Sequence, residues 1–89
     1  MLKFYGADIC KDCVAAHELL RAQNIEAEFI DITASTPNLR AFLALRDSRP
    51  EYDEVKARGG IGIPTFVWDD GSLAVGTDWL RGAGRCTDC

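Results

Sequence analysis

The chain has 89 residues, of which 47% are hydrophobic and 27% charged, so it can bury one hydrophobic core but not two. Its formal net charge of -4 argues against general attraction to nucleic acid or an anionic membrane, because phosphate groups repel an acidic surface. No apolar run approaches the roughly 18 residues of a membrane span, and residues 1–5 lack the features of a signal peptide. We therefore expect one cytoplasmic domain.

The first third of the chain predicts a strand, a helix and a second strand. Residues 2–5 are mostly apolar and end at Gly6, which indicates a short buried strand. Residues 11–23 are mostly helix formers, and their expected apolar face consists of Val14, Ala15, Leu19 and Leu20. Residues 27–32 alternate between apolar and charged side chains, so we expect a second strand that is parallel to the first in a βαβ unit.

A second helix is expected after this unit. Ser35-Thr36-Pro37 is typical of a helix start, with the proline in the first turn. The expected apolar stripe of this helix consists of Leu39, Phe42, Leu43 and Leu45. Pro50 should break the helix, and residues 51–58 predict one more short polar helical stretch, which Gly59-Gly60 ends.

The remaining residues predict a hairpin and a tail. Residues 61–68 are apolar and β-branched except for Gly62 and Pro64, and residues 73–75 predict the returning strand after a turn at Asp70-Gly71. Residues 83–89 contain too little apolar material to pack, so we expect them to be a mobile tail. The prediction is a folded domain over residues 1–82, followed by a tail that carries a second Cys-x-x-Cys.

The first Cys-x-x-Cys, Cys10-Lys11-Asp12-Cys13, carries the strongest chemical signal in the chain. Residues three apart share a helix face, so the two sulfurs can bond with little backbone movement. Cys10 lies at the expected helix start, where unpaired N–H groups and the helix dipole favour a thiolate, whereas Cys13 lies one turn deeper. We therefore expect Cys10 to attack and Cys13 to resolve the mixed disulfide.

Metal binding is the alternative use of these cysteines. One version is a zinc thiolate site, and the other is an iron–sulfur cluster that Cys10 helps to hold between two chains. The zinc site would use both Cys-x-x-Cys motifs, namely Cys10, Cys13, Cys86 and Cys89. His17, one turn after Cys13, is expected to be a partly exposed helix residue and not a ligand.

Ile63-Pro64-Thr65 supplies a second signal. A proline that enters an apolar strand has no N–H for the ladder, so it marks a sheet edge, a bulge or a cis turn. Over about residues 1–80, the order of elements, the Cys-x-x-Cys at a helix start and the apolar-proline strand together resemble glutaredoxin. The resemblance implies a thioredoxin-like α/β fold with a four-stranded mixed sheet flanked by helices.

The resemblance also implies roles for particular residues. Pro64 would be cis and would face the cysteine pair, and the backbone of Ile63 would pair with an extended thiol peptide such as glutathione. Thr65 is included as the neighbour of this pair. Asp78 is the candidate for holding the γ-glutamyl end of glutathione, and Tyr5, at the end of the first strand, is a further candidate to line the substrate groove.

The implied activity is that of a monomeric thiol–disulfide oxidoreductase. It would reduce protein or glutathione mixed disulfides with no bound cofactor, and glutathione would be the electron donor, with a reductase as a further partner. Some family features are missing, because Ala7 stands where glutaredoxins usually have a lysine that contacts a glutathione carboxylate. The glycine pair that holds the γ-glutamyl end is reduced to Gly76. The resemblance therefore supports the thiol chemistry more strongly than it supports glutathione as the donor.

Overall fold

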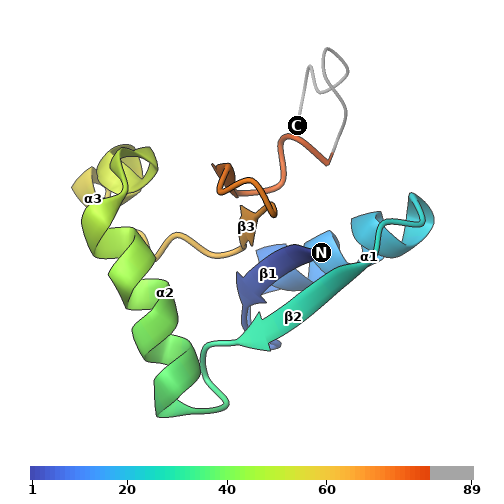
Figure 1. Cartoon of the computed structure of the whole chain (residues 1–89), viewed down its shortest axis with the longest axis horizontal. Helices are drawn as coiled ribbons and strands as arrows, with labels where there is room; N and C mark the ends of the chain where they lie inside the picture. The colour runs from blue at the N-terminus through green and yellow to red at the C-terminus, as the bar shows by residue number, and fades with distance from the viewer. Residues whose placement is uncertain (81–89) are drawn as a thin grey trace.

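The computed structural model describes residues 1–80, and residues 81–89 lie outside the described part. Figure 1 shows the course of the chain. The elements in chain order are β1 (Leu2–Gly6), α1 (Lys11–Ala22), β2 (Ala27–Asp31), α2 (Thr36–Ser48), the 3-10 helix η1 (Pro50–Tyr52), α3 (Asp53–Ala57), β3 (Thr65–Val67) and β4 (Leu73–Val75). The predicted boundary at residue 82 and the predicted tail lie outside the described residues.

The four strands form one mixed sheet in the order β2-β1-β3-β4. β1 and β2 are parallel, as the predicted βαβ unit requires, because α1 carries the chain back between them. β3 is antiparallel to both of its neighbours, β1 and β4. The prediction of an α/β protein with a four-stranded mixed sheet flanked by helices is confirmed.

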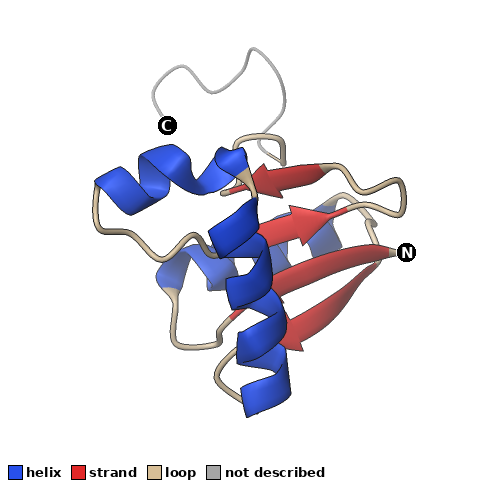
Figure 2. Cartoon of the chain, turned by 60° about the vertical axis from the view of Figure 1, so that its left-hand side comes forward, coloured by secondary structure: helices blue, strands red, loops and turns tan. Residues whose placement is uncertain are grey.

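Alternation along β1 builds a core on each face of the sheet. Phe4 packs on one face with Cys13 and Ala16 of α1, and Tyr5 packs on the other face with Phe42 of α2 and with Tyr52. Figure 2 shows the same layering, with α2 in front of the sheet and α1 behind it. The central strand β1 therefore lies between two packed layers, and the chain passes from its end to the start of α1.

The helix starts and ends follow the predicted signals. The Ser35 side chain accepts a hydrogen bond from the Asn38 N–H at 3.3 Å, and Pro37 lies in the first turn of α2. Gly59 follows α3 with a φ of 77°, a conformation that glycine adopts at little cost.

The predicted apolar faces of the helices are partly wrong. Val14 is 46% exposed, and Leu39 and Leu43 are each 39% exposed. The residues that α1 buries are Cys13, Ala16 and Leu20, so the true face is rotated toward the cysteine pair. Within residues 1–80, no helix combines the length and the apolar character needed to cross a membrane.

The third strand is much shorter than predicted: it covers only Thr65–Val67, whereas the prediction was residues 61–68. The segment before it is held in another way, since the Arg46 side chain donates hydrogen bonds to the carbonyls of Gly60 and Ile61 at 2.7 and 2.8 Å. Backbone groups bonded to a side chain on α2 are not available to a strand ladder. The result is an irregular loop that leads into the proline.

Candidate active site

Cys10 lies at the N-cap of α1. Its backbone is extended, with a φ of -97° and a ψ of 124°, and its carbonyl accepts the first helical hydrogen bond, from the Val14 N–H at 3.0 Å. The Cys10 N–H donates to the Ala7 carbonyl at 3.2 Å, which fixes the turn between β1 and the helix. The side chain makes no capping hydrogen bond and is partly exposed. The sulfur is therefore accessible from the protein surface.

Cys13 lies one turn further along α1 and has an exposed fraction of 0%. The Ala7 N–H donates a hydrogen bond to its sulfur at 3.4 Å. Burial is the largest cause that raises the pKa of the Cys13 thiol from 9.0 to about 12, and the Ala7 hydrogen bond opposes that rise. A hydrogen bond with Cys10 and the charges of Cys10 and Asp12 contribute to the same rise. Cys13 is therefore a protonated thiol at neutral pH, in contact with Cys10.

Gly6 makes room for the buried sulfur. A Cβ atom at this position would lie 2.8 Å from the Cys13 Sγ and 2.9 Å from a ring carbon of Phe4. Both distances are shorter than real Cβ contacts, so any larger residue would displace the thiol or the ring. The sequence predicts Gly6 only as the end of a strand, and its position four residues before Cys10 is the signal for this contact.

The segment before β3 lies beside the cysteine loop. The Ile63–Pro64 peptide bond is cis, as the resemblance to glutaredoxin implies. Pro64 and Thr65 are buried, so Thr65 acts within the protein interior and does not reach the surface. Its Oγ1 donates to the Gly62 carbonyl at 2.6 Å and accepts a hydrogen bond from the Tyr52 hydroxyl at 2.8 Å.

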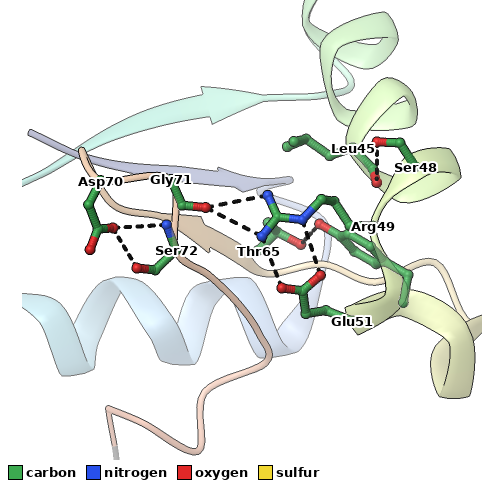
Figure 3. A network of polar contacts seen from close by, with 9 residues as sticks. Leu45, Ser48, Arg49, Glu51, Thr65, Asp70, Gly71 and Ser72 are labelled. Carbon is green, nitrogen blue, oxygen red and sulfur yellow. Dashed lines mark hydrogen bonds and ion pairs between the residues drawn. The ribbon is translucent and has the colours of Figure 1, made fainter.

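A second set of polar contacts ties the hairpin to η1, as Figure 3 shows. The Arg49 guanidinium pairs with the Glu51 carboxylate at 2.9 Å and donates two 3.3 Å hydrogen bonds to the Gly71 carbonyl. The hydrogen bond from Arg49 also lowers the pKa of Glu51. These contacts hold the turn between β3 and β4 against the helical layer, and so they support the strand that follows Pro64.

Two grooves meet along the segment from Gly60 to Ile63. The first, which we call the apolar groove, has a volume of about 540 Å³ and includes Cys10. Its other lining residues include Ala7, Ile9, Ile32, Ile61 and Ile63. Ile9 and Ile61 are 86% and 59% exposed, so an apolar surface surrounds the partly exposed sulfur.

The second groove, which we call the acidic groove, has a volume of about 670 Å³ and includes Ile63 and Pro64. Its charged lining residues are Asp12, Glu51, Glu54, Arg58 and Asp78. Glu51 is already paired with Arg49, and among the described lining residues Arg58 alone is basic. The groove is therefore negative, and Asp12, between the two cysteines, contributes to that charge.

The structure brings most of the predicted site residues together. Cys10 and Ile63 line the apolar groove, and Ile63, Pro64 and Asp78 line the acidic groove. Tyr5 is not placed with them, because it is 8% exposed and packs against Phe42, with 6.4 Å between ring centroids. It ends β1 as predicted, but its side chain points into the core opposite α1.

The other residues that bear on a metal site are His17, Cys86 and Cys89. His17 is partly exposed, as predicted, and its ring contacts Phe4 and Phe29 at centroid distances of 4.8 and 4.6 Å. Cys86 and Cys89 lie outside the described residues. Within residues 1–80, no three His, Cys, Asp or Glu side chains are grouped closely enough to hold a metal ion.

Comparison with known proteins identifies one family for this chain. The sequence is 33% identical over 78 residues to an uncharacterised protein of Haemophilus influenzae, covering 88% of this chain and 90% of that protein. This chain belongs to the family of that protein. No family model matches the sequence, and no solved structure matches it.

Proposed function

We propose that this protein is a thiol–disulfide oxidoreductase of the glutaredoxin type, built on a thioredoxin-like fold. The observation that carries the proposal is the unequal environment of two sulfurs one helical turn apart. Cys10 is partly exposed in a groove, whereas Cys13 is buried with its thiol protonated. A zinc site on this motif would need both sulfurs as thiolate ligands, whereas an exchange reaction needs one accessible nucleophile and one sheltered thiol.

The reaction begins with the Cys10 thiolate. It attacks one sulfur of a substrate disulfide, so a bond forms between Cys10 and that sulfur while the other substrate sulfur leaves as a thiolate and takes a proton. Cys13 then gives up its proton and attacks the Cys10 Sγ, which releases the second substrate sulfur. The substrate gains two electrons, and a Cys10–Cys13 disulfide remains.

The surroundings of Cys13 fit its part in this sequence. The Ala7 N–H, 3.4 Å from the Cys13 sulfur, stabilises negative charge at the moment when the proton leaves. The charge of Cys10 disfavours a Cys13 thiolate until Cys10 has been consumed in the mixed disulfide, whereas the charge of Asp12 acts throughout. The second step therefore becomes easier after the first has taken place.

The loop before Pro64 is suited to pair with an extended substrate. The carbonyls of Gly60 and Ile61 are taken by Arg46, and the carbonyl of Gly62 by Thr65. Within residues 1–80, the N–H and C=O of Ile63 make no turn, loop or side-chain hydrogen bond. Because backbone groups normally find partners, Ile63 is where a substrate backbone would pair.

The proposed setting follows from the same chemistry. The substrates are disulfides of proteins or of glutathione, and the electron donor is a thiol such as glutathione or a reductase. The reaction uses no bound cofactor. We propose that the protein works as a monomer in the cytoplasm, where a reducing thiol pool returns the Cys10–Cys13 disulfide to the dithiol.

The test compares Cys10→Ser, Cys13→Ser and the unchanged chain in reducing a small disulfide. Cys10→Ser should lose at least a hundredfold in rate, whereas Cys13→Ser should accumulate a mixed disulfide on Cys10, visible by intact-protein mass spectrometry. Metal content and free thiols are measured on the same preparations. A stoichiometric metal ion with no free thiols, or an adduct on Cys13, would contradict the proposal.

A further inference from the structure

The apolar groove and the acidic groove meet beside Cys10. They share one wall, the segment from Gly60 to Ile63. Cys10 lines the apolar groove, and Asp12, two residues further along the chain, lines the acidic groove. A substrate whose sulfur reaches Cys10 therefore has an apolar surface and a negatively charged surface within its immediate reach.

The shared wall can hold the backbone of a polypeptide at Ile63. Pro64 has no N–H, and its carbonyl accepts a hydrogen bond from the Gly76 N–H at 2.8 Å. Within residues 1–80, both backbone groups of Ile63 are without a turn, loop or side-chain hydrogen bond. An extended chain that pairs with Ile63 presents successive side chains on opposite sides. One of its side chains can therefore enter the apolar groove while a neighbouring one lies over the acidic groove.

The apolar groove favours an apolar side chain close to the substrate cysteine. Ile9 and Ile61 are large apolar side chains that are mostly exposed in this groove. An apolar side chain that packs on them removes apolar surface of both partners from water, which is favourable. Glutathione has no apolar side chain beside its cysteine, so it cannot gain this contribution.

The acidic groove favours a basic side chain on the same substrate. Apart from Glu51, which is paired with Arg49, its charged lining residues are one arginine, Arg58, and three exposed carboxylates. The carboxylates are those of Asp12, Glu54 and Asp78. A lysine or arginine of a substrate complements this charge, whereas the two carboxylates of glutathione are repelled by it.

We propose that the preferred substrate is a disulfide whose cysteine lies in an extended protein segment, with an apolar residue and a basic residue beside it; this rests on the proposed function. The apolar side chain packs in the apolar groove, the basic side chain lies along the acidic groove, and the backbone pairs with Ile63. The Cys10 thiolate bonds to the substrate sulfur and expels its partner sulfur as a thiolate, and Cys13 completes the reduction as described above. Glutathione, which lacks both side chains, is the poorer substrate.

The first experiment varies the substrate of the full chain. Short peptides carry leucine on one side of a single cysteine and lysine on the other, in both orders, and each cysteine is joined through a disulfide to nitrothiobenzoate. Attack by Cys10 releases the coloured thiolate, and the rate with Cys10→Ser is subtracted as background. In the faster order, replacing lysine by glutamate should slow release about threefold to twentyfold at low salt, and replacing leucine by serine about threefold to tenfold.

The absence of either preference would overturn the proposal. A glutathione–nitrothiobenzoate disulfide that reacts as fast as the peptide with leucine and lysine would also overturn it. If all of these probes react with Cys10 at equal rates, the substrate preference is wrong but the proposed function stands. If release is as fast with Cys10→Ser as with the unchanged chain, the proposed function fails as well.

The second experiment varies the grooves. Glu54→Lys should lower the preference for lysine over glutamate at least about twofold at low salt, and Glu18→Lys, exposed on α1 and lining neither groove, should leave it unchanged. Ile61→Ser should lower the preference for leucine, and Leu43→Ser, exposed on α2, is its matched control. A preference as strong in Glu54→Lys or Ile61→Ser as in its control would overturn the assignment of that groove.

A second copy of this chain is the other occupant that the apolar groove could take. Sedimentation of the reduced full chain distinguishes the two cases. A monomer leaves the groove to the substrate and supports the proposal. A dimer that Ile61→Ser converts to a monomer, while Leu43→Ser does not, would overturn it.

Discussion

The Tyr52–Thr65–Gly62 hydrogen bonds permit a sharp test of how the loop before Pro64 is held. The single hydroxyl proton of Thr65 is used on the Gly62 carbonyl, so the Tyr52 hydroxyl must be the donor in its contact with Thr65. All three residues are buried. Thr65→Val therefore leaves both the Tyr52 O–H and the Gly62 C=O without a partner in the core.

The expected cost follows from these two lost bonds. Each unsatisfied buried group costs about 1 to 3 kcal/mol, so Thr65→Val should lower the free energy of unfolding by about 2 to 6 kcal/mol. Tyr52→Phe removes the donor but leaves the bond between Thr65 and Gly62, and should cost about 0.5 to 1.5 kcal/mol. In the double variant only the Gly62 carbonyl is unsatisfied, so its cost should fall at least about 1 kcal/mol below the sum of the single costs.

Urea unfolding of the four proteins measures this cycle, with Thr33→Val as the control. Thr33 is exposed, and its hydroxyl and its N–H both donate to the nearby Asp31 carboxylate, so the loss of the hydroxyl should stay within about 0.5 kcal/mol. An additive double variant, or a Thr65→Val chain as stable as the control, would refute the reasoning. The loop before Pro64 would then be held by Arg46 and by packing alone.

Three further predictions follow from the site. The free energy of unfolding of the reduced protein should fall as the pH rises from about 9 toward 12, by up to about 1.4 kcal/mol per pH unit, because the unfolded chain loses the Cys13 proton first. Measuring the free energy of unfolding against pH for Cys13→Ala and for the unchanged chain isolates this effect. Gly6→Ala should cost about 1 to 3 kcal/mol in chemical denaturation and lengthen the life of the mixed disulfide, because its Cβ would crowd the Cys13 sulfur. Glu54→Lys should lower the KM for glutathione about twofold to fivefold at low salt, because it removes a carboxylate that repels the carboxylates of glutathione, and it should have no effect at 0.5 M salt. Glu18→Lys is the control, and equal KM values for the two variants would contradict this prediction.

The local signals in the sequence were sufficient for the order of elements. The Ser35 cap, Pro37 and the turn at Asp70-Gly71 act within a few residues of themselves, so their outcomes could be predicted without the fold. The exposed positions of Val14 and Leu43 could not, because which face of a helix is buried depends on the sheet that it covers. Packing of α1 against Phe4 turned its buried face toward Cys13.

The candidate site shows the same division. The spacing of Cys10 and Cys13 predicts their adjacency, because three residues make nearly one helical turn. The role of Gly6 depends on a contact across the strand-to-helix turn, and the role of Tyr52 depends on a hydrogen bond between η1 and β3. Contacts of that kind come from the tertiary arrangement, which residue spacing does not encode.

The buried residues and the groove residues of the candidate site affect different properties of the protein. Cys13 and the residues that place it, Gly6 and Ala7, are buried, so a change at any of them alters stability and chemistry together. Asp12, Glu54 and Asp78 are exposed and have no part in the core clusters, so substitutions there should cost about 0.5 kcal/mol or less in stability. Their charges act on whatever enters the acidic groove. The packing of α1 against β1, together with the charge of Asp12, therefore sets the environment of the Cys13 sulfur, whereas we expect substitutions of Glu54 and Asp78 to change the preferred substrate while leaving the fold intact.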